Sequence, residues 1–122
     1  MMKVDKPWGH EIRWAINEKY LGKILHINRG ESLSRQYHEV KDETIYVLQG
    51  LLILELGMDE SKNNQAEKIK ILETGESYRI KPGTIHRFVA PNEGYVRLIE
   101  VSTPEIDDVV RLQDIYGRET KK

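Results

Sequence analysis

Four side chains that could bind a metal ion occur in two short stretches of the chain. Gln36, His38 and Glu43 lie close together, and His86 follows in a later stretch. Alternate side chains of an extended strand share a face, so Gln36 and His38 point the same way. If Glu43 opens the neighbouring strand toward that face, three ligands converge and His86 supplies a fourth. A single histidine on a strand is more often an ordinary residue, so the spacing alone leaves the metal site open.

The donor types indicate which ions such a site would hold. Imidazole, carboxylate and amide oxygen suit a divalent transition metal such as Zn, Mn, Fe, Co or Ni. Ligands on separate strands would be held rigidly, as a metal site requires. Water or substrate oxygens would complete the coordination shell and leave a position open for chemistry.

Short extended segments separated by Gly and Pro turns must position these ligands. We predict nine or ten strands and little helix, the main ones at residues 11–15, 20–28, 33–37, 43–49, 51–56, 68–72, 77–80, 86–90 and 95–102. This pattern predicts an all-β barrel or sandwich, and a closed form would also protect the strand edges. A short C-terminal helix could occupy residues 105–112, because Pro104 precedes acidic residues and Gly117 could end it, with a tail to residue 122.

Composition narrows the classes of function. The 122 residues are the size of one domain, so we expect a single domain over residues 1–122. The net charge of −1 and the lack of a long basic block give no support to nucleic-acid or membrane-surface binding. The absence of cysteine excludes disulfides and thiolate ligands. No apolar run approaches the roughly 18 residues of a membrane span, and no secretory signal is visible, so we expect a soluble cytoplasmic protein.

Two motifs resemble those of the cupin superfamily. The first runs from Gly30 through a five-residue gap, Gln36-x-His38, a four-residue gap, Glu43, a six-residue gap and Gly50. The second runs from Gly75 to Lys81-Pro82-Gly83-Thr84-Ile85-His86. Three positions depart from the usual pattern: Gln36 replaces a His, Lys81 a Pro and Ala90 an Asn. The resemblance implies a single cupin domain, a double-stranded β-helix (jelly-roll) barrel covering roughly residues 20–102.

Further stretches are similar to the C-terminal cupin domain of type II mannose-6-phosphate isomerases, which accompanies a guanylyltransferase domain. They are Lys6-Pro7-Trp8-Gly9, Leu33-Ser34-x-Gln36-x-His38, Leu98-Ile99-Glu100-Val101, Asp107-Asp108-Val109-Val110-Arg111 and Asp114-x-Tyr116-Gly117-Arg118. This resemblance implies that Gln36, His38, Glu43 and His86 hold one divalent transition metal per chain. It also implies a sugar or sugar-phosphate ligand and a homodimer.

Glu100 is the candidate catalytic base. Aldose–ketose isomerisation moves a proton between adjacent carbons and needs a base beside them. Alternation places Glu100 on the same face as Val96 and Leu98, so an inward Glu100 would be a buried carboxylate, and such groups are often functional. The alternative is a strand-end carboxylate in a salt bridge.

Several basic residues could bind the phosphate of a sugar phosphate, since arginine contacts phosphate with two parallel hydrogen bonds. The candidates are Arg35, Lys81, Arg87, Arg97 and Arg111, of which we favour Arg111 and Arg87. Alternation places Arg35 and Arg87 opposite the ligand face, where a surface or inter-strand ion pair is the alternative.

Three functions stay open at this stage. The first is a metal-dependent isomerase of the mannose-6-phosphate isomerase type. The second is a non-catalytic cupin that binds a metal and a sugar, and the third is another metallo-cupin reaction, an oxygenase or an epimerase. A fold by itself does not separate them.

Overall fold

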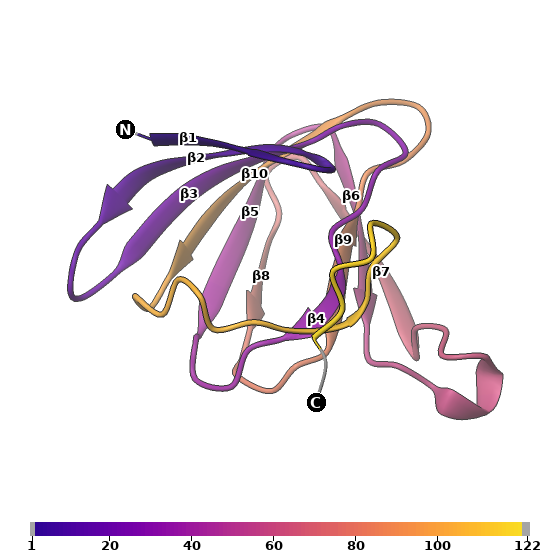
Figure 1. The fold of residues 1–122 in the computed structure, drawn as a ribbon. Helices are drawn as coiled ribbons and strands as arrows, with labels where there is room; N and C mark the ends of the chain where they lie inside the picture. Colours follow the sequence, from indigo (N-terminus) through magenta and orange to yellow (C-terminus); the bar gives the residue numbers. More distant parts are fainter. Residues whose placement is uncertain (1, 121–122) are drawn as a thin grey trace.

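Two antiparallel sheets form the structure, a computed structural model that describes residues 2–120 (Figure 1). The first sheet has the order β1-β2-β3-β10-β5-β8, and its strands span Met2–Lys6, Gly9–Ile16, Leu21–Ile27, Val96–Ser102, Glu43–Gln49 and Ser77–Ile80. The second has the order β11-β4-β9-β6-β7, with strands Val110–Gln113, Arg35–Tyr37, His86–Val89, Leu51–Leu56 and Lys68–Glu73. A short 3₁₀ helix, Glu60–Lys62, lies in the loop between β6 and β7. The predicted all-β fold is confirmed.

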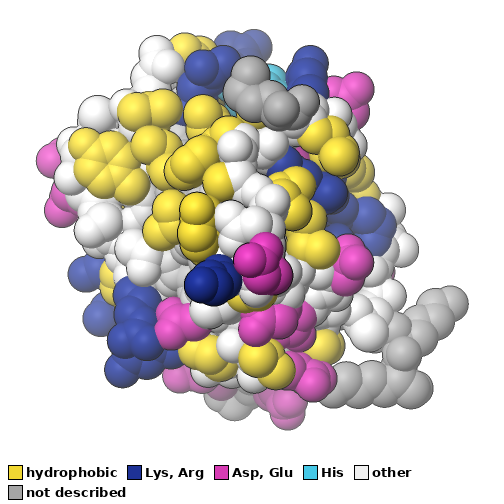
Figure 2. All heavy atoms as spheres, turned by 90° about the vertical axis from the view of Figure 1, so that its left-hand side faces the viewer, with side chains coloured by type: hydrophobic (Ala, Val, Ile, Leu, Met, Phe, Trp, Pro, Cys, Tyr) yellow, Lys and Arg dark blue, Asp and Glu magenta, His cyan; other side chains and the backbone are white. Residues whose placement is uncertain are grey.

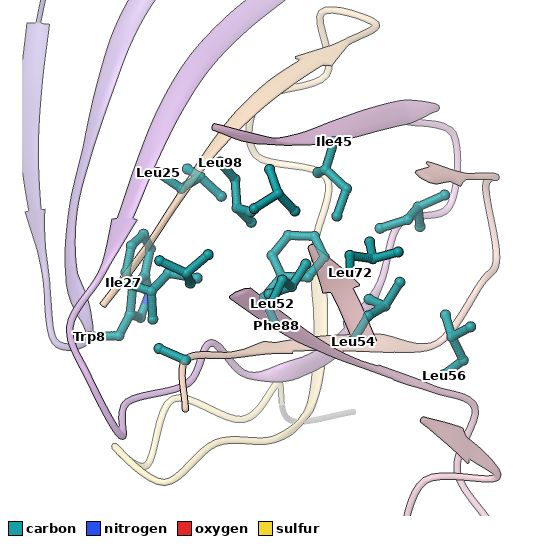
Figure 3. Close-up of a cluster of buried hydrophobic side chains, with 14 residues drawn as sticks. Trp8, Leu25, Ile27, Ile45, Leu52, Leu54, Leu56, Leu72, Phe88 and Leu98 are labelled. Atoms are coloured by element: carbon teal, nitrogen blue, oxygen red, sulfur yellow. The ribbon is translucent and has the colours of Figure 1, made fainter. Parts of the chain in front are cut away.

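The core lies between the two sheets and comes from alternate residues of each strand. Figure 3 shows Ile45 and Leu98 of the first sheet facing Leu52 and Phe88 of the second. All four side chains are at most 1% exposed. Trp8, in the turn between β1 and β2, joins the same cluster. Because a strand presents alternate side chains to one face, each strand contributes an apolar side to this core.

Gly50 makes the tight corner between β5 and β6. Its φ is +90°, and a Cβ atom there would lie 2.6 Å from the carbonyl oxygen of Tyr95. Only glycine fits this left-handed and crowded position without strain. The corner therefore lets β5 join the first sheet and β6 the second, which places their inward faces opposite one another.

The predicted C-terminal helix is wrong for the described residues. Residues 103–109 cross between the sheets as turns and bends, and residues 110–113 form β11. Val110 pairs with Tyr37 and Arg111 with Gln36 on β4. The β-branched pair Val109-Val110 favours an extended backbone, and the β4 edge supplies the hydrogen bonds that a helix would have made internally. Residues 2–6 also form a strand, β1, that the sequence pattern did not predict.

Apolar side chains also occur on the outer face of the first sheet. A row of directly paired residues, Ile12, Ile24, Ile99 and Tyr46, crosses β2, β3, β10 and β5 on that face. Hydrophobic side chains gather on the side of the molecule that is the left of Figure 1, as Figure 2 shows. The homodimer stays a prediction. No helix of residues 2–120 is long and apolar enough to cross a membrane.

Candidate metal centre

His38, Glu43 and His86 converge at one end of the barrel interior. Glu43 opens β5, His86 opens β9, and His38 follows directly after β4. The Nε2 atoms of His38 and His86 lie 3.2 and 3.3 Å from the same oxygen, Oε1 of Glu43. One ligand atom from each side chain falls within 4.8 Å of the other two, and all three residues are buried. The structure thus brings together three of the four predicted ligands.

The second nitrogen of each imidazole faces a backbone carbonyl. His38 Nδ1 lies 2.5 Å from the Asp108 oxygen, and His86 Nδ1 lies 2.8 Å from the Thr84 oxygen. A carbonyl can only accept, so Nδ1 of each ring donates to it and Nε2 of each ring points toward Glu43. His86 Nε2 is buried and has no hydrogen-bond partner among the described residues. With Nε2 deprotonated, the two imidazoles beside a carboxylate would fit a divalent ion.

Gln36 reaches the same region from the neighbouring strand. It pairs with His86 across β4 and β9, and its side chain lines the cavity in front of the three ligands. Its Oε1 accepts a hydrogen bond from the Ser34 hydroxyl at 2.8 Å. This bond fixes the direction of the amide oxygen, which keeps a second lone pair for another partner.

Charge around Glu43 is balanced by a buried lysine that the sequence analysis missed. Lys41 Nζ lies 3.6 Å from Glu43 Oε2 and 3.3 Å from Glu100 Oε2. Burial would raise the pKa of Glu43, but the close imidazoles of His38 and His86 and the charge of Lys41 hold it well below its usual range. Burial lowers the pKa of Lys41, and the two carboxylates outweigh that effect and raise it. Lys41 lies in the loop before β5, where strand alternation does not apply, so the sequence offered no signal for it.

Glu100 points inward, as alternation predicted. It is 4% exposed, on the same face of β10 as Val96 and Leu98. Burial, followed by the nearby charge of Glu43, raises its pKa to about 7, against the opposing effect of Lys41. A carboxyl group with a pKa near neutrality can both accept and return a proton under ordinary conditions.

The opposite wall of the cavity is strongly basic. Glu11 lies 3.8, 2.8 and 3.2 Å from Lys6, Arg13 and Lys23. Burial lowers the pKa of Lys6, and the charges of Lys23, Arg13 and Arg111 add to this effect while Glu11 opposes it. One carboxylate thus faces several cations, which leaves positive charge for an anion. The sequence analysis missed Glu11, Arg13 and Lys23, although the alternation of β2 and β3 places all three inward.

The predicted phosphate-binding arginines separate into two groups. Arg111 lines the cavity, and its buried Nε has no hydrogen-bond partner among the described residues. Arg35 and Arg87 lie outside the cavity on the other face of the second sheet, where both bind Glu55, at 2.8 and 2.9 Å. For both arginines this is the inter-strand ion pair that the sequence analysis gave as the alternative to phosphate binding. Arg97 also faces outward and donates to His26 at 3.1 Å.

The space enclosed by these walls is a cavity of about 260 Å³. Its lining includes Gln36, His38, Glu43, Glu100 and Arg111, whereas His86 is fully buried behind them. Sites for small ligands usually measure about 300 Å³ or more, so this cavity suits a small polar molecule.

Comparison with known proteins finds a family profile and curated relatives that match this chain. A profile of the cupin domain matches residues 23–102, about two thirds of the chain. Mannose-1-phosphate guanylyltransferase of Escherichia coli strain K12 is 34% identical over 119 residues, which cover 95% of this chain but 23% of that protein. The chain thus spans about a quarter of the length of the curated relatives that it matches.

Solved structures share the fold. KdgF from a Halomonas species superposes with a TM-score of 0.73 at 22% identity, covering 88% of this chain and 90% of that one. A cupin-superfamily sugar phosphate isomerase from Silicibacter pomeroyi superposes with a TM-score of 0.63 at 19% identity, covering 77% of this chain and 58% of that one. At these identities the likeness shows the fold alone.

Proposed function

Because this chain belongs to the cupin family, we propose that it is a metal-dependent enzyme that acts on a sugar or a sugar phosphate. The reaction we favour is aldose–ketose isomerisation of the mannose-6-phosphate isomerase type. The observation that carries the proposal is the convergence of His38, Glu43 and His86 next to a buried carboxylate, Glu100. Similarity to a sugar nucleotide enzyme over nearly the whole chain supports a sugar-related ligand.

Each residue of the centre has a role in this proposal. Gln36, His38, Glu43 and His86 would hold one divalent ion. When bound, that ion would supply a Lewis acid that polarises a sugar oxygen. Glu100 takes the proton from one carbon of the sugar and returns it to the adjacent carbon. The hydroxyl proton passes from the oxygen of the first carbon to that of the second, so no proton is gained or lost overall.

The surrounding residues bind and orient the sugar. The ammonium of Lys41 forms an ion pair with Glu100 and keeps the base in place. Arg111 offers the free donor of its Nε to an anionic group such as a phosphate. The basic wall of Lys6, Arg13 and Lys23 attracts the same anion, so a phosphorylated sugar suits the cavity better than a neutral one.

Elemental analysis of the purified protein tests the metal centre first. We expect about one transition metal per chain in the wild type and none in the double variant His38→Ala/His86→Ala. The matched control is His10→Ala/His26→Ala, which removes two histidines that stack on each other outside the cavity. A wild type that holds no metal and takes none up on loading would exclude a metal-dependent mechanism.

Turnover of sugar phosphates by the loaded protein tests the reaction. Glu100→Gln should reduce kcat by about a hundredfold or more while leaving the metal content unchanged. If the wild type binds metal and sugar phosphate without converting them, the protein is a binding module. Iron-dependent consumption of oxygen would instead favour an oxygenase.

A further inference from the structure

Asp108 connects the C-terminal part of the chain to the turn that carries His38. It lies between β10 and β11, in a segment that contributes Ile106 and Val109 to the cavity lining. Its side chain faces the loop between β4 and β5, whose residues are far away in sequence. The sequence analysis included Asp108 in a family-like stretch but gave it no role.

One carboxylate binds three successive backbone donors of that loop. Oδ1 of Asp108 accepts from the N–H of Glu39 at 3.1 Å, and Oδ2 accepts from those of Val40 and Lys41 at 2.8 and 2.9 Å. Consecutive N–H groups that point at one anion form a concave anion-binding turn, and charge-assisted bonds of this kind are the stronger ones. The backbone conformation of the loop is therefore fixed by Asp108 rather than by a strand partner.

The backbone carbonyl of the same residue binds the preceding histidine. His38 Nδ1 donates to it at 2.5 Å, which assigns a hydrogen to Nδ1 and directs Nε2 toward Glu43. Four consecutive residues, 38–41, thus depend on Asp108. Two of them carry groups of the candidate centre: His38 supplies a ligand nitrogen, and Lys41 places its ammonium between Glu43 and Glu100.

We propose that Asp108 is a positioning residue of the metal centre. It holds the 38–41 turn so that the His38 imidazole has the correct tautomer and direction and Lys41 reaches the two buried carboxylates. Outer groups that orient a metal-bound histidine typically contribute tenfold to a hundredfold in metal affinity. The part of the proposal that concerns metal affinity rests on the proposed function, whereas the part that concerns the turn and the tautomer does not.

The test combines Asp108→Ala with two measurements on the metal-free protein and one with Co²⁺. In the variant we expect amide hydrogen exchange at Glu39, Val40 and Lys41 to accelerate by about tenfold. Nitrogen NMR of the His38 ring should show a mixture of tautomers in place of the Nδ1–H form. Calorimetric titration should show Co²⁺ binding weakened by about tenfold to a hundredfold.

Two further variants keep the test decisive. Glu93→Ala removes the same charge from an exposed residue that does not line the cavity and should leave all three measurements unchanged. Asp108→Asn keeps one acceptor oxygen and serves if the alanine variant fails to fold; its effects should be intermediate.

The outcomes separate the two proposals. Wild-type tautomer and wild-type Co²⁺ affinity in a folded Asp108 variant would overturn the positioning role, even if the amides exchange faster. If the wild type itself binds no Co²⁺, the proposed metal function fails, and the His38 tautomer alone then decides the positioning role.

Discussion

The barrel interior has an apolar part and a charged part that share the same strands. Moving two residues along a strand keeps the side chain on the inner face but changes its character, from Glu43 to Ile45 on β5, from His86 to Phe88 on β9 and from Glu100 to Leu98 on β10. All six side chains are buried. The apolar part gains free energy from the removal of carbon surface from water, whereas the charged part loses hydration that it recovers only through close partners.

This contrast indicates which part holds the fold and which part serves function. A buried ionic cluster is often no more stabilising than apolar residues of the same shape. Proteins commonly keep such clusters where activity needs them, at a cost in stability. We therefore expect substitutions in the apolar part to act on the free energy of unfolding. Those in the charged part should act mainly on binding and turnover, unless they leave buried charges without a partner.

The largest effect should come from Phe88→Ala in the apolar part. The ring is 1% exposed and lies between the two sheets, so its loss removes buried surface and leaves a cavity (Figure 3). We expect the free energy of unfolding to fall by about 3–5 kcal/mol, measured by urea denaturation. Ile71→Ala, at a site that is 51% exposed, is the control and should change it by under about 0.5 kcal/mol. Equal losses in the two variants would mean that the apolar part is not the main source of stability.

Glu11→Gln should have the next largest effect, on a charged cluster away from the predicted ligands. Glu11 contacts Lys6, Arg13 and Lys23, and a neutral amide would leave these cations without their shared partner. We expect a loss of about 2 kcal/mol in the free energy of unfolding near neutral pH.

The pH dependence of that loss gives a further check. Burial would raise the pKa of Glu11, but the charge of Lys23 and the hydrogen bond from Arg13 lower it overall. A carboxyl group whose pKa is depressed in the folded state stabilises the fold above its ordinary value of 4.5, and this contribution fades as the pH falls through the depressed value. The difference between wild type and variant, measured by urea denaturation, should therefore shrink below about pH 4.5. A difference independent of pH would show that packing, not charge, is responsible.

The apolar part of the interior could be predicted from the sequence. Alternation of apolar residues between Gly and Pro turns predicted nearly all strands of the barrel, because the hydrophobic pattern and the inward face have the same period of two. The strand at residues 2–6 was not predicted, because the charged residues Lys3, Asp5 and Lys6 interrupt the apolar pattern at the sheet edge. The helix at 105–112 was predicted from local signals, and tertiary pairing with β4 overrode them.

Residues of the charged part could be predicted only where a family motif or strand alternation indicated them. His38, Glu43, His86 and Glu100 were named from the cupin resemblance and from alternation. Lys41 was not named and Asp108 was given no role, because nothing in a polar loop distinguishes a solvated residue from one that folds back onto a site. The contact between Asp108 and His38 spans 70 residues, and only the tertiary structure brings the two together.

A third prediction compares two arginines on opposite faces of the second sheet. Arg111 faces the charged cavity, and Arg87 pairs with Glu55 outside it. Arg111→Gln should raise the KM for a sugar phosphate by about tenfold with little change in kcat, since it removes a charged hydrogen bond made equally in the ground and transition states. Arg87→Gln should change KM by less than about twofold. Steady-state kinetics of both variants measure these changes. Equal changes in KM would mean that the phosphate binds at a different surface.

The smallest effect concerns the stability of the charged part itself. Glu100 and Glu43 share one ammonium, that of Lys41, so the buried group carries an excess negative charge. Glu100→Gln removes that excess and still leaves the Lys41–Glu43 pair. In metal-free protein at pH 7.5 we expect the free energy of unfolding to rise by about 1 kcal/mol, measured by urea denaturation, although turnover is lost. Glu93→Gln, at an exposed site, is the control and should change nothing. A clear loss of stability in Glu100→Gln would mean that Lys41 requires both carboxylates. The charged part would then hold the fold together in the same way as the apolar part, and the contrast between them would disappear.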